Sequence, residues 1–271
     1  MEFFDREEEM ERLERLSKTG GLGFIWGRRR IGKTRLLLEW CKKNDGLYTV
    51  ADQSAAPIQR RYFAASLAAR FPGFDQVEYP DWRSLLGRIS AEAVHQQWRG
   101  PLILDEFPYL AVTSPELPSI FQVWVDHEVK NSKLAVVLAG PSQWMMQGLV
   151  MRAREALYGR ATEAFHLQPL PAGYLSEALG LSSARDVILA YAAWGGVPRY
   201  WELVSESGLA LDRGVDHLVL NPLGLLHEEP ERLLLEELPP AVGLRSIMDQ
   251  SASALTGCRK LQHESVRLPH P

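Results

Sequence analysis

Four residues near the start of the chain have the types and spacing of a phosphate-binding loop. Gly27, Gly32, Lys33 and Thr34 satisfy the pattern G-x-x-x-x-G-K-[ST], between a short apolar run and a helical pattern. Glycines let consecutive backbone N–H groups point at phosphate oxygens, and a helix that begins near the lysine adds positive potential. The lysine would bridge β- and γ-phosphates, and the threonine hydroxyl would ligate Mg²⁺. The pattern predicts a site for a nucleoside triphosphate and Mg²⁺.

The variable positions of this loop are rich in positive charge. Arg28, Arg29 and Arg30 precede Ile31, and Arg35 follows the threonine. The arginines could meet phosphate oxygens or a partner, and the alternative is a set of solvent-exposed loop charges. All five residues are candidates for nucleotide binding.

A pair of carboxylates follows a second apolar run, at residues 102–104. Asp105, at the carboxyl end of the expected strand, would hold Mg²⁺ directly or through a water. Glu106 would polarise the attacking water as a general base. Behind a phosphate-binding loop, this pair predicts a Walker B strand and hydrolysis.

The second carboxylate is typical of P-loop proteins in which an extra strand lies between the P-loop strand and the Walker B strand. Residues 134–139 are the candidate for that inserted strand. Its tip would lie near the γ-phosphate, where Ser142 could act as a hydrogen-bonding sensor. The alternative for Ser142 is a turn-forming serine after a proline.

Around these motifs, apolar runs alternate with helical patterns, which predicts a parallel α/β sheet. Expected strands lie at 22–26, 47–51, 102–104 and 134–139, and expected helices at 5–18, 57–71, 82–98 and 120–129. From about residue 171 the periodicity is helical only. We therefore expect a nucleotide-binding α/β domain at 1–170, a small helical domain at 171–240 and a tail at 241–271.

Several motifs together resemble the archaeal-type ATPase family, a branch of the STAND class of AAA+-like P-loop NTPases. The resemblance covers nearly all of residues 2–238. It rests on the following pieces: FFDRE at 3–7, GRRRIGKT, LILDE, AGPS, LYGR at 157–160, GGVPRY at 195–200, NPL at 221–223 and EP at 229–230. It implies a P-loop sheet flanked by helices and followed by a helical lid.

The resemblance also implies roles for four further residues. Phe4 and Arg6 are similar to an N-terminal segment that packs beside the adenine and ribose, although Asp5 stands where related motifs often have glycine. Pro198 is similar to a lid proline that touches the adenine, with a simple helix stop as the alternative. Arg160 resembles an arginine that reaches the γ-phosphate in cis or from a neighbouring subunit, with a surface salt bridge as the alternative.

Composition excludes several classes of protein. The net charge of −4 and a pI of about 6.0 argue against a chain-wide footprint for nucleic acid. The acidic N-terminus and the lack of a long apolar run predict a cytoplasmic protein with no membrane partner. Two cysteines are too few for a disulfide framework, and the scattered histidines predict no metal beyond Mg²⁺.

The tail departs from the family pattern. Family members usually continue into a winged helix and often a nuclease-like domain, and LRSIMDQ at 244–250 is similar to the start of a winged helix. The following residues do not continue it. The expectation is a C-terminally truncated member whose tail is a remnant, so DNA is a possible partner that this tail does not support.

The leading hypothesis is an ATP-hydrolysing molecular switch, in which Mg-ATP closes the helical domain over the P-loop. ATP and ADP are the expected ligands because no N-K-x-D motif for guanine is present, and a protein partner or a homo-oligomer is possible. Two alternatives stay open. One is a non-hydrolysing, nucleotide-bound interaction or DNA-tethering module, and the other is a P-loop small-molecule kinase.

Overall fold

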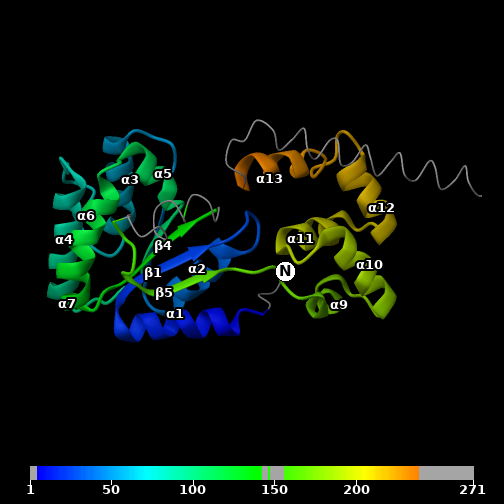
Figure 1. Ribbon diagram of the computed structural model, residues 1–271, viewed down its shortest axis with the longest axis horizontal. Coiled ribbons are helices and arrows are strands. Elements are labelled where there is room, and N and C mark those ends of the chain that lie inside the picture. Colours follow the sequence, from blue (N-terminus) through cyan, green and yellow to red (C-terminus); the bar gives the residue numbers. More distant parts are fainter. Residues whose placement is uncertain (1–4, 142–145, 147–155, 238–271) are drawn as a thin grey trace, which may run out of the picture.

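A computed structural model describes residues 5–141, 146 and 156–237. Its centre is a sheet of five parallel strands within these residues (Figure 1). The strands lie in the order β2-β3-β4-β1-β5. Their bounds are β1 Gly21–Trp26, β2 Leu47–Val50, β3 Leu102–Asp105, β4 Ala135–Gly140 and β5 Ala161–His166.

Strand β4 lies between the P-loop strand β1 and the strand β3 that ends in Asp105. Gly21 pairs with Ala135, and Leu102 pairs with Val136. This order confirms the predicted inserted strand and the predicted fold class. Because the strands are parallel, their carboxyl ends share one edge of the sheet, and the chain leaves β1 at that edge to form the P-loop.

Strand β5 was not predicted from the sequence. It forms the edge of the sheet beside β1, and Phe165 is its one buried side chain. Four of its six residues are exposed. An edge strand with so little burial lacks the apolar pattern by which strands are recognised.

One face of the sheet is covered by helices that contribute most of the aromatic core. These elements are α3 Ala56–Ala68, α4 Trp82–His95, α5 Phe107–Thr113, α6 Leu117–Trp124, η1 Val125–Val129 and α7 Lys130–Ser132. Phe24, Leu104 and Leu138 of the strands pack on this side with the buried rings of Trp82 and Phe121. Helix α5, which follows Glu106 directly, was not predicted, because it is short and carries a proline in its first turn.

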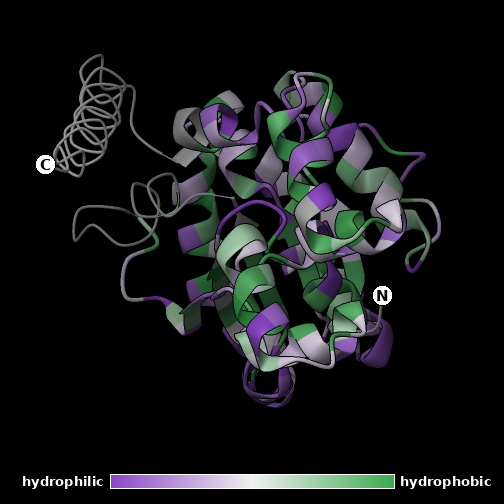
Figure 2. Cartoon of the chain, turned by 90° about the vertical axis from the view of Figure 1, so that its right-hand side faces the viewer, coloured by the Kyte–Doolittle hydropathy of each residue, from purple (hydrophilic) through white to green (hydrophobic). Residues whose placement is uncertain are grey.

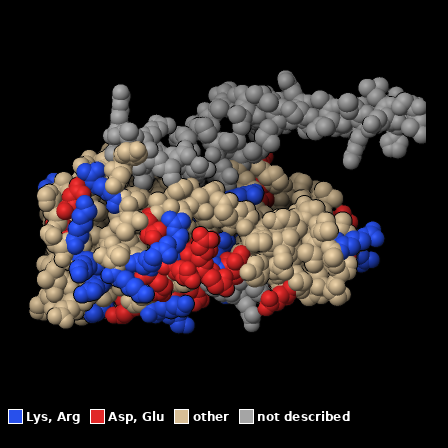
Figure 3. Space-filling view, turned by 60° about the horizontal axis from the view of Figure 1, so that its bottom comes forward, with Lys and Arg blue, Asp and Glu red and all other residues tan. Residues whose placement is uncertain are grey.

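The opposite face is covered by α1 Glu7–Thr19 and α2 Lys33–Lys43. Met10, Leu13 and Leu16 of α1 are buried, as their helical spacing predicts. The remaining surface of α1 is charged, and Figure 3 shows acidic and basic side chains gathered on this side of the molecule. The helix expected at 5–18 is therefore confirmed, with an apolar face on the sheet and a charged face outside.

Residues 172–237 form a helical region beyond the carboxyl edge of the sheet (Figure 1). Its elements are η3 Ala172–Tyr174, α9 Leu175–Leu179, α10 Ala184–Trp194, α11 Pro198–Ser207, α12 Leu211–Val215, η4 Asp216–Leu220 and α13 Glu229–Glu237. The buried Trp194 and Trp201 belong to the same apolar cluster as the residues under α1 and α2. In Figure 2, the hydrophobic colours concentrate on the strands and the inward sides of the helices. The core therefore continues from the sheet into the helical region.

The expected tail at 241–271 lies outside the described residues. Within the described part of the chain, no helix has the length and apolar character needed to cross a bilayer.

Candidate nucleotide site

The P-loop connects β1 to α2, and two of its glycines have distinct structural reasons. Gly27 lies against the backbone of Leu167, and a Cβ added to this glycine would stand only 2.9 Å from the carbonyl oxygen of Leu167. Gly32 precedes α2 with a φ of 97°, a conformation that L side chains rarely adopt. These two positions fix the loop at the N-terminus of an eleven-residue helix, where backbone N–H groups are unpaired and anions are stabilised.

Lys33 is held inside this loop. Its side chain is buried, and Nζ donates hydrogen bonds to the carbonyl oxygens of Gly27 at 2.7 Å and Arg28 at 3.3 Å. The loop therefore keeps an ammonium group beside the helix N-terminus, where a phosphate group would meet both.

Thr34 and Asp105 meet in space although 71 residues separate them. The threonine Oγ1 donates to Asp105 Oδ2 at 3.1 Å, and the carboxylate is almost fully buried. Asp105 Oδ1 accepts from the backbone N–H of Glu106 at 3.0 Å. Hydroxyl and carboxylate oxygens are the ligands that Mg²⁺ prefers, and Mg²⁺ takes most of its other ligands from phosphates and water. The pair fits Mg²⁺, and no group of three or more His, Cys, Asp or Glu side chains suited to a metal occurs among the described residues.

Glu106 projects from the turn between β3 and α5. Its φ of 57° is a left-handed conformation that costs a non-glycine residue on the order of 1 kcal/mol, and such strain gathers at functional sites. The residue is half-buried and lines the same cleft as Lys33 and Thr34. The structure thus brings both predicted carboxylates to the P-loop.

The arginines of the loop are half-buried and not simply exposed loop charges. Arg29 Nη2 donates to the hydroxyl of Tyr109 in α5 at 3.1 Å. Arg30 has a φ of 66°, and its Nη1 lies 3.2 Å from Oε2 of Glu229 in the helical region. The exposed Arg35 contributes a longer contact of 3.9 Å to Glu202 of α11. The loop therefore contacts both the sheet domain and the helical region through its positive charges.

A cleft of about 1040 Å³ opens over the P-loop. At the P-loop end its lining is charged or polar, from Arg29, Arg30, Lys33, Thr34 and Glu106, and Arg199 and Glu202 of α11 add charges on the helical side. The apolar part of its lining comes from Ile31, Leu38, Leu170, Pro198, Leu203 and Leu225. A charged end beside an apolar wall matches a ligand that carries phosphates on one side and a flat ring on the other, and the volume lies at the upper end for small-molecule sites.

Pro198 begins helix α11, while Gly195 ends α10. Both parts of the helix-stop alternative are therefore present. The proline nevertheless reaches the loop, because an added Cβ on Gly32 would lie 3.8 Å from its Cγ. Pro198 therefore both begins α11 and lies against the P-loop.

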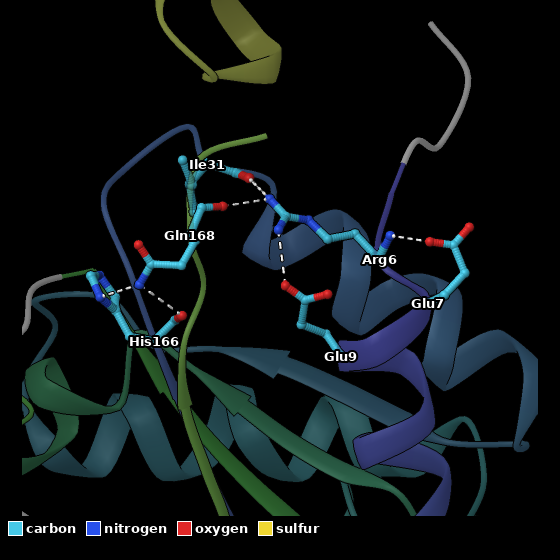
Figure 4. A network of polar contacts seen from close by, with 6 residues as sticks. All are labelled: Arg6, Glu7, Glu9, Ile31, His166 and Gln168. Atoms are coloured by element: carbon cyan, nitrogen blue, oxygen red, sulfur yellow. Dashed lines mark hydrogen bonds and ion pairs between the residues drawn. The ribbon is translucent and has the colours of Figure 1, made fainter. Parts of the chain in front are cut away.

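Arg6 connects the start of the chain to the P-loop (Figure 4). Its buried guanidinium donates to the carbonyl oxygens of Ile31 at 3.2 Å and Gln168 at 2.9 Å, and it pairs with Glu9 at 3.0 Å. The residue lines the cleft, but these guanidinium contacts are with the protein itself. Arg6 therefore fixes the back of the P-loop. Phe4, the other residue expected beside the base, lies outside the described residues.

The structure does not bring Arg160 to the cleft. Its Nε pairs with Asp126 Oδ2 of η1 at 2.9 Å, as the salt-bridge alternative predicts. Arg160 directly precedes β5, and the first residue of β5 pairs with Leu22 near the start of β1. Arg160 therefore lies at the end of the sheet where the strands begin, opposite the P-loop. At about 3.3 Å per strand residue, that end is roughly 20 Å from the P-loop, which corrects the expectation of a γ-phosphate contact in cis. A contact with a neighbouring subunit stays a prediction, and Ser142 lies outside the described residues.

Four residues at the site were missed at the level of sequence: Tyr48, Tyr109, Tyr200 and Glu229. Each one binds a predicted residue or its partner through its phenol or carboxylate. Tyr48 lies inside the expected strand at 47–51, Tyr200 inside the GGVPRY motif and Glu229 inside the EP dipeptide. No spacing rule connects them to the P-loop, because they reach it through tertiary packing.

The profile of a protein family described as "ATPase domain predominantly from Archaea" matches residues 3–204. The chain belongs to this family. The match spans the P-loop, both carboxylates, all five strands and most of α11. The resemblance noted in the sequence is thereby confirmed.

This chain is also similar to individual proteins in sequence and in structure. An uncharacterized protein of Methanocaldococcus jannaschii is 30% identical over 206 residues, which are 74% of this chain and 44% of that protein. The Walker-type ATPase PABY2304 of Pyrococcus abyssi has a similar structure, with a TM-score of 0.68 and 18% identity over 85% of this chain and 75% of that one. The ORC2 protein of Aeropyrum pernix, in ADPNP and ADP complexes, gives a TM-score of 0.53 and 16% identity over 85% and 71%.

The chain spans less than half the length of the Methanocaldococcus relative. The structural likenesses, at these low identities, establish the fold.

Proposed function

We propose that the chain binds and hydrolyses Mg-ATP, and that nucleotide occupancy controls the position of its helical region. The observation that carries the proposal is the cleft itself. Lys33, Thr34 and Glu106 line one side of it, and Pro198, Leu203 and Leu225 of the helical region line the other. A ligand held there would touch both parts of the chain, which is the arrangement that a STAND-class switch requires.

The charged end of the cleft suits a triphosphate. The N-terminus of α2 and the ammonium of Lys33 would bind β- and γ-phosphate oxygens, with Arg29 and Arg30 within the same loop. Thr34 and Asp105 would hold Mg²⁺, which neutralises charge on the phosphates. Glu106 would accept a proton from the water that attacks the γ-phosphorus, so that ADP and phosphate are the products.

The apolar wall suits the base. Leu38, Leu170 and Pro198 offer surface against which an adenine ring can lose its contact with water. The Aeropyrum protein, of similar fold, is named as a complex with ADPNP and ADP, which supports the choice of adenine nucleotides.

The helical region is linked to the P-loop by charge. Glu229 accepts a hydrogen bond from the hydroxyl of Tyr200 at 2.9 Å and pairs with Arg30 of the loop. Burial and this hydrogen bond raise the pKa of Tyr200 to about 12, so the phenol remains a donor at neutral pH. Phosphate groups in the loop would compete with Glu229 for Arg30. Nucleotide binding and release would thereby change the attachment of the helical region.

The test is steady-state hydrolysis of Mg-ATP by the full chain, compared with Lys33→Ala, Glu106→Gln and the control Glu116→Gln. Glu116 is exposed at the start of α6 and is not a cleft residue. Lys33→Ala should abolish nucleotide binding or turnover. Glu106→Gln should retain ATP binding while hydrolysis slows by about 10²- to 10⁴-fold, the usual contribution of a general base.

Three other outcomes would contradict the proposal or favour one of the alternative functions. Turnover that is unchanged in Lys33→Ala would refute the P-loop assignment. Bound nucleotide with no turnover in the unaltered chain would favour the non-hydrolysing module. Phosphate transfer to an organic acceptor in preference to water would favour the kinase.

A further inference from the structure

Tyr48 of β2 contacts the carboxylate that the proposed function assigns to the metal. Its Oη donates to Asp105 Oδ2 at 2.7 Å, the shortest of the hydrogen bonds to that group. In the parallel register Tyr48 pairs with Ile103, and Asp105 lies two residues further along the same strand face. The tyrosine is long enough to reach past Ile103 to the strand end, so strand pairing itself determines the contact.

The hydrogen bonds to Asp105 divide its two oxygens into different roles. Oδ2 accepts hydrogen bonds from both Tyr48 and Thr34, and these two bonds occupy both lone pairs of that oxygen. Oδ1 accepts from the backbone N–H of Glu106 and keeps a second acceptor position. Asp105 is 2% exposed, so a rotation that broke these hydrogen bonds would leave buried carboxylate oxygens without donors.

Tyr48 acts on Asp105 as a neutral donor. A tyrosine hydroxyl has an ordinary pKa of about 10 and is protonated at neutral pH, so it donates to the carboxylate. A neutral donor on a buried carboxylate is the arrangement by which proteins orient metal-binding groups from the second layer.

We propose that Tyr48 is a positioning residue for the metal: its hydroxyl holds the Asp105 carboxylate in the orientation in which Asp105, together with Thr34, would hold a divalent cation directly or through a water. The inference rests on the proposed function, because it assumes that Thr34 and Asp105 hold a divalent cation with ATP. It adds a residue from β2 to a site otherwise built from the P-loop and β3. Tyr48 makes no contact with the nucleotide in this arrangement and acts through Asp105.

The test compares Tyr48→Phe with the unaltered chain and with the control Tyr79→Phe. Phenylalanine keeps the ring and removes the hydroxyl. Tyr79 is a buried tyrosine whose hydroxyl accepts from Arg88 at 2.7 Å, and it does not line the cleft. The probe is Mn²⁺ titrated against each protein with the β,γ-imido analogue of ATP, and free Mn²⁺ is read from its electron paramagnetic resonance spectrum. Affinity for the analogue is measured separately in EDTA.

Tyr48→Phe should weaken Mn²⁺ binding about 10-fold, the lower end for loss of a second-layer partner. Affinity for the analogue in EDTA should stay within about twofold, which shows an intact P-loop. Tyr79→Phe should leave both affinities unchanged. A merely structural role of Tyr48 would weaken both affinities together, and this outcome would overturn the proposal.

Unchanged or tighter Mn²⁺ binding by Tyr48→Phe would also overturn it, while the proposed function stands. Failure of the unaltered chain to bind the analogue refutes the proposed function and the inference together. Binding of analogue and Mn²⁺ without ATP turnover refutes only hydrolysis. The three failures are therefore distinguishable.

Discussion

Replacement of Glu229 by glutamine should make the chain less stable and make it bind ATP more tightly. The carboxylate of Glu229 is 9% exposed and lies 3.2 Å from Arg30, which is 31% exposed. Glutamine keeps the shape and can still accept from Tyr200, but it removes the charge that holds the arginine. Arg30 is then released for phosphate oxygens, which no longer compete with Glu229 for it.

The magnitude follows from the burial of the two partners. At 3.2 Å and an effective dielectric constant near 20, the attraction is about 5 kcal/mol, most of which is offset by desolvation. Because Arg30 is about one-third exposed, water screens the pair further and rehydrates the arginine in the variant. A net loss of about 1–2 kcal/mol is expected, which lowers Tm by several degrees in a chain of this size. In the unaltered chain, ATP must break this ion pair to reach Arg30. Without the pair, the same 1–2 kcal/mol raises ATP affinity about 5- to 30-fold.

The assay is a titration with a fluorescent ATP analogue, together with urea unfolding, on Glu229→Gln, Arg30→Gln and Glu228→Gln. Arg30→Gln removes the same ion pair from the other side and should lose stability, but it should bind ATP more weakly because a phosphate ligand is gone. Glu228 is the exposed neighbour of Glu229 and serves as the matched control with no change expected. Affinities that fall in both pair variants, or that stay unchanged in both, would refute the competition.

Two further predictions concern other parts of the chain. Burial, and then the charge of Asp45, raise the pKa of Cys41 to about 11 from 9.0, so its thiolate fraction at pH 8 falls roughly 100-fold. In a Cys258→Ser variant, the native chain should react with a disulfide reagent at least that much more slowly than the urea-unfolded chain, and equal rates would contradict a buried Cys41. Arg160→Gln should cost less than about 1 kcal/mol at pH 7 and leave ATP turnover unchanged, since the arginine pairs with Asp126 at the far edge of the sheet. Burial acts to raise the pKa of Asp126, but hydrogen bonds from Arg160 and Lys130 outweigh it and hold that pKa below 3.8; the cost should therefore be present above pH 4 and vanish as the pH falls through the lowered pKa. Loss of turnover in dilute and concentrated protein alike would contradict the purely structural role, and loss that depends on protein concentration would indicate a contact between subunits.

The sequence by itself determined four strands of the sheet and the central residues of the candidate nucleotide site. Apolar runs located four strands, and the P-loop pattern with a carboxylate pair located the residues that converge at their carboxyl ends. Such features are local, because a strand, a glycine turn and a helix start are each encoded within about ten residues. Even the inserted strand β4 followed from the chemistry, since the second carboxylate indicated a class of P-loop protein with that strand order.

Only the tertiary structure decided how the site is completed. Tyr48 reaches Asp105 across a strand register, and Glu229 reaches Arg30 from a helix almost 200 residues away in the chain. Arg160 fails to reach the cleft in cis because β5 runs parallel to β1 and places it at the opposite edge. The physical reason is common to these cases. Pairing between strands and the packing of the helical region depend on the whole chain, whereas spacing along the sequence records only what neighbours do.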